Sequence, residues 1–172
     1  MSDIRLWRQR CHMRDLSNRC EVVGPAVDPT TGYNDEEMKV INETRKIFGD
    51  PDIRVSATCV RVPVLRAYCV AINFECERPV TPTEVREIVR TAPGVELVDD
   101  VAQNYFPIPK DASGRDPILV GRIRRDLSDP SGRSIAMFVA GDQLLKGAAL
   151  NAVQIAEKLL AICPEATYDD VS

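Results

Sequence analysis

The stretch Val55-Ser-Ala-Thr-Cys-Val-Arg-Val-Pro-Val-Leu-Arg-Ala-Tyr68 decides how this sequence is interpreted. Apolar and polar residues alternate through its first half, which is the period of a β-strand with one buried face. Arg61 continues the buried side of that strand. Pro63 has no amide hydrogen to give to a neighbouring strand, so strand pairing is expected to stop there. The residues predicted to face the core are Ile53, Val55, Ala57 and Cys59.

Further elements are predicted on both sides of this stretch. A helix begins after Asn34, whose side chain can accept hydrogen bonds from the free amides of the first turn, and it ends at Gly49. A second helix begins at Thr81-Pro82-Thr83-Glu84, where Thr81 and Glu84 can form a capping box. Strands are predicted over residues 67–77, 95–98, 118–127 and 134–140. The faces expected to be apolar are Met38, Ile41 and Phe48 on the first helix and Val85, Ile88, Val89 and Ala92 on the second.

The last predicted helix, residues 147–162, is apolar almost all round, and a helix of that kind is buried on more than one side. Residues 99–117 form a long loop, and long loops in compact domains are often functional or make interfaces. The sum of these elements predicts an α+β fold with a mixed, largely antiparallel sheet covered by helices.

Composition narrows the classes of function. The chain has 172 residues, 44% of them hydrophobic and 28% charged, which suits one soluble domain. Residues 1–24 hold five arginines and three acidic residues, which gives this segment a charge of +2. Since the whole chain has a net charge of -4, residues 25–172 carry about -6. An acidic body argues against nucleic-acid binding. No apolar run approaches the roughly 20 residues that a bilayer span requires, so we expect no membrane insertion.

The six cysteines show no C-x-x-C pair and do not cluster with the lone His12. We therefore expect no zinc site or other metal site. No secretory signal is visible, which favours reduced thiols and a cytoplasmic location. The arginine-containing start also leaves a plastid transit remnant open.

Three separated motifs follow one another in the order found in aspartate-semialdehyde dehydrogenases: Gly32-Tyr-Asn-Asp-Glu-Glu-Met-Lys-Val-Ile-Asn-Glu-Thr-Arg-Lys-Ile-Phe-Gly49, the stretch ending at Tyr68, and Gly141-Asp-Gln-Leu-Leu-Lys-Gly-Ala-Ala-Leu-Asn-Ala-Val-Gln-Ile-Ala-Glu157. The sequence thus resembles the C-terminal, substrate-binding and dimerisation domain of this family from about Gly32 to Leu160. The resemblance implies a fold like the C-terminal domain of semialdehyde and glyceraldehyde-phosphate dehydrogenases. It divides the chain into an irregular lead-in (1–31), the dimerisation domain (32–162) and a tail (163–172).

The resemblance also implies substrate-binding residues. Glu36 and Lys39 match a pair that holds the substrate amino group and an anion, and their spacing places both on one helical face. Arg61 matches an arginine that binds the substrate carboxylate, a task suited to its planar set of donors. Without the resemblance, Glu36 and Lys39 read as a solvated ion pair and Arg61 as part of a structural ion pair.

Tyr68 stands where the family has a histidine that acts as general acid/base. A phenol titrates near pH 10 rather than near neutrality, so a tyrosine is a poor proton shuttle at this position. Cys69 and Val70 depart from the family pattern as well. Gln143 matches a residue that contacts the nicotinamide cofactor, and the cofactor of this family is NADP.

The sequence shows no glycine-rich turn for NADP and no cysteine in a nucleophile motif, so the resemblance implies a chain without the family's N-terminal nucleotide-binding domain. The family's reaction is the reductive dephosphorylation of aspartyl phosphate to aspartate semialdehyde, in the pathway to lysine, threonine and methionine. Whether this chain is an enzyme therefore stays open, and we expect it to be inactive alone. The alternatives are a non-catalytic partner that forms a dimer with a full-length homologue, a homodimer of the domain, and a small-molecule-binding module that keeps only the anion pocket.

Overall fold

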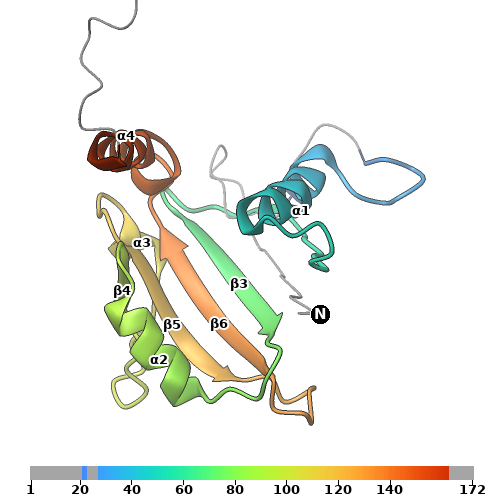
Figure 1. The fold of residues 1–172 in the computed structure, drawn as a ribbon, viewed down its shortest axis with the longest axis vertical. Helices are drawn as coiled ribbons and strands as arrows, with labels where there is room; N and C mark the ends of the chain where they lie inside the picture. Colours follow the sequence, from blue (N-terminus) through green and yellow to red (C-terminus); the bar gives the residue numbers. More distant parts are fainter. Residues whose placement is uncertain (1–20, 23–26, 163–172) are drawn as a thin grey trace, which may run out of the picture.

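The computed structural model describes residues 21–22 and 27–162. Its centre is a four-stranded sheet in the order β3-β6-β5-β4, formed by β3 (Tyr68–Glu75), β6 (Ser134–Gly141), β5 (Ile118–Arg125) and β4 (Val95–Leu97). β3 pairs antiparallel with β6, β6 antiparallel with β5, and β4 parallel with β5 (Figure 1). The expected mixed, largely antiparallel sheet is confirmed, and each predicted strand of this sheet is found within two residues of its predicted bounds.

One face of the sheet packs against α2 (Pro82–Thr91), which lies over β4 and β5 (Figure 1). Thr81 and Glu84 form the expected capping box at the start of this helix, and Pro82 is its first residue. Val85 is its buried contact, whereas Ile88 is 62% exposed, so the predicted apolar stripe was too wide. The core on this face consists of Val80, Val85, Val120, Ile123 and Ile135.

The other face carries a second core near the end of the sheet where β3 begins and β6 ends. Ala67, Cys69, Val98, Ala112, Leu119 and Ala140 are buried there. α3 (Pro109–Ala112) lies within the loop that was predicted to have no regular structure, and Ala112 belongs to this core. The long loop is thus anchored to the sheet.

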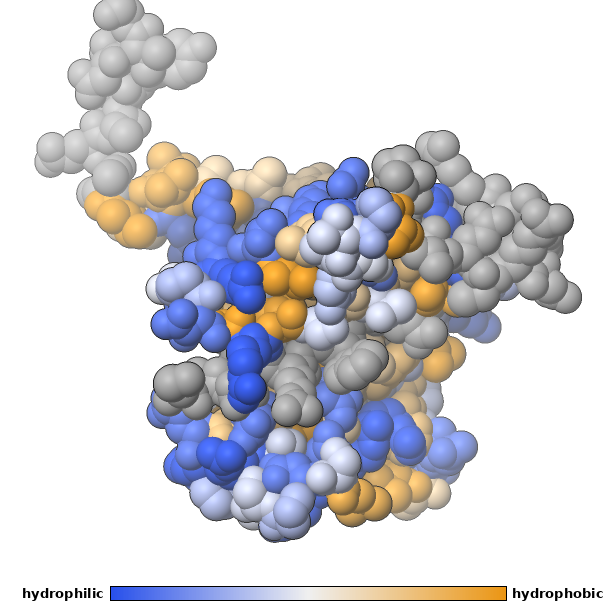
Figure 2. Space-filling model, turned by 90° about the vertical axis from the view of Figure 1, so that its right-hand side faces the viewer, coloured by the Kyte–Doolittle hydropathy of each residue, from blue (hydrophilic) through white to orange (hydrophobic). Residues whose placement is uncertain are grey.

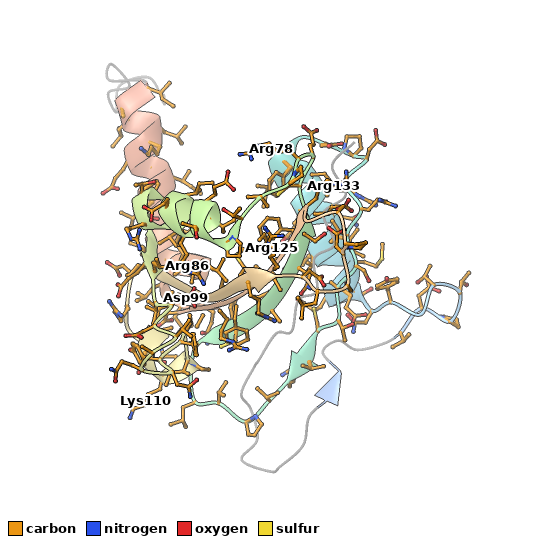
Figure 3. The ribbon with its side chains drawn as sticks, turned by 90° about the horizontal axis from the view of Figure 1, so that it is seen from below. Arg78, Arg86, Asp99, Lys110, Arg125 and Arg133 are labelled. Carbon is orange, nitrogen blue, oxygen red and sulfur yellow. The ribbon has the colours of Figure 1, made fainter. Side chains whose placement is uncertain are left out.

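A bulge in β5 fixes the loop of residues 99–117 to the sheet. The pairing with β6 shifts register between Gly121 and Arg124, and Arg122 has a positive φ of 54°. A Cβ at Gly121 would lie 1.9 Å from the carbonyl oxygen of Val98, so only glycine fits. Asp99 holds the bulge, because its carboxylate accepts the Arg122 amide at 2.7 Å and pairs with Arg86 Nε of α2 at 2.7 Å (Figure 3).

α1 (Asp35–Phe48) lies beside the β3 edge of the sheet (Figure 1). Asn34 caps it and Gly49 ends it in the left-handed conformation, as the sequence predicts. Val40 and Ile41 are buried, whereas Phe48 is 61% exposed, so its assignment to the apolar face was wrong.

The predicted strand over residues 53–59 is not a paired strand. Ile53, Ala57 and Cys59 are buried as the alternation requires, but Val55 is only half-buried, so its assignment to the core was wrong. Regular pairing is limited to β2 (Val60–Arg61), opposite β1 (Glu21–Val22). Ala57 and Cys59 pack instead against Val40 of α1. Side-chain packing on a helix therefore produces the same alternation as a sheet. β1 lies in the segment expected to be irregular, while most of that lead-in and the tail lie outside the described residues.

The final helix is α4 (Leu150–Ile162), which follows a short π-helical turn, η1 (Leu145–Ala149). The prediction that it is buried on more than one side was wrong for this chain, because no residue of α4 is buried. Its apolar side chains gather at the top of the molecule in Figure 2. The large exposed ones are Val153, Ile155, Leu159, Leu160 and Ile162. In the part of the chain that the structure describes, no helix combines the length and the apolar character that a bilayer crossing needs.

Candidate functional site

Tyr68 and Gln143 meet at the end of the sheet next to α4. Tyr68 is the first residue of β3 and pairs with Gly141, the last residue of β6, so Gln143 follows two residues beyond that pair. A methyl group added at Gly147 would lie 3.4 Å from the Tyr68 hydroxyl and 3.6 Å from Gln143 Cβ. Strand register therefore brings two of the sequence-predicted site residues together from positions 75 residues apart.

The backbone immediately before Tyr68 is in a rare conformation. Ala67 is 1% exposed and has a φ of 74°, in the left-handed region that costs a residue with a Cβ about 1–2 kcal/mol. Such strain persists only where the surroundings hold it, and it is frequent at functional sites. The turn at Ala67 sets the direction in which β3 starts and thus the position of the phenol.

Asp142, between Gly141 and Gln143, is the buried charge of this site. Its side chain is fully buried, and its carboxylate accepts the amides of Gly114 at 2.6 Å and Leu144 at 2.9 Å. Arg66 Nε lies 2.7 Å from the same carboxylate. Burial alone would raise the pKa of Asp142, but the two amides and the Arg66 guanidinium outweigh it and lower the pKa below its usual range.

The sequence reasoning missed both Asp142 and Arg66. One signal was available in the sequence: Asp142 directly follows a predicted strand that ends in Ala-Gly. A charged side chain buried at the end of a strand needs hydrogen-bond or ionic partners, so this position could have been singled out. Its partners lie 28 and 76 residues earlier in the chain, and no local pattern reveals them.

Gln143 has one feature of a ligand-binding side chain. Its Oε1 is buried and accepts no hydrogen bond in the described part of the chain. A buried acceptor without a donor is costly, and a bound amide N–H would satisfy it.

Glu36 and Lys39 lie on α1, with Glu36 half-buried and Lys39 exposed. The neighbouring Glu37 points into the protein instead. Its carboxylate accepts the Asn34 amide at 3.1 Å and the Cys59 amide at 3.0 Å. Adjacent positions of the helix thus hold a structural acid, Glu37, and the acid that the resemblance implies as a ligand, Glu36.

Arg61 is half-buried on β2, two residues beyond Cys59, so it belongs to the same part of the molecule as α1. The structure therefore groups the candidate residues in two sets. Tyr68 and Gln143 share the sheet end, while Glu36, Lys39 and Arg61 are carried by α1 and the segment packed on it. Among the residues described, no group of three His, Cys, Asp or Glu side chains forms a metal site.

Comparisons with known proteins identify the family of this chain. Residues 20–146 match the family model described as the dimerisation domain of semialdehyde dehydrogenase. The chain belongs to this family. An aspartate-semialdehyde dehydrogenase of Synechocystis is 56% identical over 128 residues, which cover 74% of this chain and 37% of that protein. One from Prochlorococcus marinus is 51% identical over 131 residues, covering 76% of this chain and 38% of that protein.

Solved structures give the same fold for this semialdehyde dehydrogenase domain. Aspartate semialdehyde dehydrogenase II of Vibrio cholerae, complexed with ASA, superposes with a TM-score of 0.78 at 38% identity over 91% of this chain and 44% of that one. The enzyme of Candida albicans, solved with NADP, shares the fold with a TM-score of 0.71 at 22% identity, over 94% of this chain and 51% of that one. The chain thus spans less than half the length of the curated relatives named here.

Proposed function

We propose that this chain serves as the dimerisation and substrate-binding domain of an NADP-dependent aspartate-semialdehyde dehydrogenase. The reaction would be the reductive dephosphorylation of aspartyl phosphate, which supplies lysine, threonine and methionine synthesis. The observation that carries the proposal is the meeting of Tyr68 and Gln143 over Gly147 at the end of an intact sheet. The match over residues 20–146 and the identity with the Synechocystis enzyme support it.

In this proposal Glu36 and Arg61 bind the amino and carboxylate groups of the substrate, and Lys39 binds its phosphate. Each residue carries the charge that its partner needs: an acid for an ammonium, a guanidinium for a carboxylate and an ammonium for an anion. Arg61 is half-buried and Lys39 is exposed, so a ligand can reach Lys39 without displacing protein contacts.

The hydrogen-bonding capacity of Gln143 suits the nicotinamide group of NADP. The buried Oε1 of Gln143 has no donor in the described part of the chain, and the carboxamide of a nicotinamide ring carries N–H donors. When bound, NADPH supplies the hydride for the reduction. Gln143 would then orient the ring by accepting a hydrogen bond, beside the Tyr68 phenol.

Tyr68 leads us to propose that this polypeptide is inactive by itself. A phenol at the acid/base position transfers protons poorly at neutral pH, and none of the six cysteines lies in the family's nucleophile motif. We propose further that the chain acts in the cytoplasm. Cys76 forms no disulfide, which is usual for a cysteine of a protein in a reducing compartment.

The experiment that tests the proposal is size-exclusion chromatography with light scattering, on the chain alone and mixed with the Synechocystis enzyme. We expect a species of twice the mass of one chain, or a mixed dimer, because a retained dimerisation domain forms a symmetric interface. A monomer at all concentrations would contradict the proposal. NADP-dependent turnover of aspartate semialdehyde by the pure chain would contradict the inactivity.

A second candidate function is a non-catalytic partner of a full-length dehydrogenase. The observation that favours it is the contrast between a preserved sheet with its caps and the tyrosine at the acid/base position. A mixed dimer whose activity differs from that of the full-length homodimer would support this role.

A further inference from the structure

Three separate segments of the chain meet at the carboxylate of Asp142. Oδ1 accepts the amide of Leu144, at the start of the turn into η1. Oδ2 accepts the amide of Gly114, after α3, and lies 2.7 Å from Nε of Arg66. Both oxygens are therefore occupied, and the side chain has no contact with solvent.

Two of these segments, those of Arg66 and Leu144, border the pair formed by Tyr68 and Gln143. Arg66 precedes the strained Ala67, which leads into Tyr68. Leu144 follows Gln143 directly, and the Asp142 carbonyl oxygen also accepts the amides of Leu145 at 3.3 Å and Gly147 at 3.5 Å. The backbone on both sides of the candidate site is thus held by one residue.

We propose that Asp142 is a positioning residue whose carboxylate fixes Tyr68 relative to Gln143, through Arg66 on one side and the Leu144 amide on the other. The inference rests on the proposed function only in taking Tyr68 and Gln143 as the reacting end of the site. Asp142 itself touches no ligand in this account.

Asp142→Asn is the informative substitution. Asparagine has nearly the shape of aspartate but only one acceptor oxygen, so its NH₂ group would face an N–H donor at one of the two oxygen positions. It also removes the charge that attracts Arg66. The turn at Ala67 then loses the contact that opposes its unfavourable backbone conformation.

Asp99 provides a matched control. Its side chain is 1% exposed, Oδ1 accepts a backbone amide at 2.7 Å and Oδ2 lies 2.7 Å from an arginine Nε, which is the pattern found at Asp142. Its partners are Arg86 of α2, labelled in Figure 3, and the Arg122 amide of the β5 bulge, so Asp99 joins α2 to β5 rather than to β3. Asp99→Asn therefore imposes a similar chemical loss at a place that does not border Tyr68.

The readout is ¹⁹F NMR of the full chain labelled with 3-fluorotyrosine, with the Tyr68 signal assigned by Tyr68→Phe among the four tyrosines. We expect Asp142→Asn to shift or broaden the Tyr68 signal while the Tyr33 signal stays in place, since Tyr33 bonds to Ser56 in another part of the molecule. We expect Asp99→Asn to leave the Tyr68 signal unchanged. An unchanged Tyr68 signal in folded Asp142→Asn, or equal changes in both variants, would overturn the proposal.

Substitutions of Arg66 test the same proposal if the Asp142→Asn variant does not fold. The Arg66 side chain is 40% exposed, so Arg66→Gln removes the ion pair with less disturbance of the core. We expect Arg66→Gln to move the Tyr68 signal and Arg66→Lys, which keeps the cation, to restore much of it. Equal signals in these two variants and the wild type would refute the role of the pair. The NMR signal needs no ligand, so failure of the chain to bind NADP or to dimerise would count against the proposed function alone.

Discussion

At the scale of single residues, three buried carboxylates hold backbone segments together, whereas the exposed acids near them do not. Glu37, Asp99 and Asp142 each accept backbone amides with both side-chain oxygens engaged, and each joins segments distant in the sequence. A buried carboxylate is tolerated only with such partners, because an unpaired buried charge is very costly. Their removal should therefore affect folding more than removal of surface acids.

Glu37 gives a direct test of this expectation. We predict that Glu37→Ala lowers the free energy of unfolding by about 1–3 kcal/mol, because the amides of Asn34 and Cys59 lose their acceptor. Glu43 is exposed on the same helix, and Glu43→Ala should change stability by no more than about 0.5 kcal/mol. Urea unfolding followed by circular dichroism measures both. Equal losses would show that the buried hydrogen bonds of Glu37 contribute nothing.

Acid should destabilise the protein through Asp142 and Asp126. The pKa of Asp126 is lowered chiefly by hydrogen bonds from Ser128, and that of Asp142 by its amides and Arg66 acting against burial. A carboxyl whose pKa is lowered by folding stabilises the native state above its unfolded pKa, and this stabilisation is lost as pH falls through the lowered value. We predict that the urea midpoint decreases from about pH 5 downward.

Asp142→Asn should flatten that decrease, because asparagine does not titrate. Asp99→Asn serves as the reference, because it makes the same substitution at a buried, arginine-paired carboxylate elsewhere in the sheet. A decrease of unchanged steepness in Asp142→Asn would exclude Asp142 as a contributor.

At the scale of elements, the helix boundaries were predictable because their signals are local. Asn34 and Gly49 bound α1, and Thr81 and Glu84 begin α2, as the capping rules require. The hairpin of β5 and β6 also followed from two apolar runs and a polar turn. Elements whose burial depends on a distant partner were predicted less well.

The segment 53–59 and α4 show why. The alternating burial of residues 53–59 comes from packing on α1. An alternation of apolar and polar residues does not show whether the buried side chains pack on a helix or belong to a paired sheet. The apolar surface of α4 predicts that the helix is buried, yet no residue of α4 is buried here. The sequence of a helix does not show whether the protein surface that would cover it is part of the same chain. For the site, the resemblance supplied Tyr68 and Gln143, while Asp142 and Arg66 became visible only through long-range contacts.

The exposure of α4 leads to a prediction about core truncation. Leu160 is 61% exposed, so Leu160→Ala should change the free energy of unfolding by less than about 0.5 kcal/mol. Leu119 in β5 is fully buried, and Leu119→Ala should cost about 2–5 kcal/mol. Thermal and urea unfolding of the two variants provide the comparison. A large loss in Leu160→Ala would mean that α4 is covered in solution, for example by a second copy.

At the scale of the whole molecule, the chain corresponds to less than half of the dehydrogenases it resembles. Its sheet has two packed cores, while its last helix exposes apolar side chains. A body of this kind can fold and still depend on other protein surfaces for activity.

A chimera tests what the domain contributes to an enzyme. We predict that joining residues 32–162 to the remaining part of the Synechocystis enzyme gives a weak dehydrogenase, and that Tyr68→His raises its kcat/KM by about 10²–10⁴-fold, the usual contribution of a general acid/base. Tyr68→Phe is the control, and it should stay as weak as the tyrosine form. A chimera that is fully active with Tyr68 would show that the phenol can perform the proton transfer.

The separate packing of α1 has a mechanical consequence. Val40, Ala57 and Cys59 form a buried cluster distinct from those of the sheet, and residues 62–66 connect the two clusters along the chain. The distance between the charges on α1 and the phenol on β3 then depends on this five-residue segment, which Pro63 stiffens. Lengthening or softening this segment would change the distance between the proposed substrate-binding charges and the phenol without altering any of those side chains.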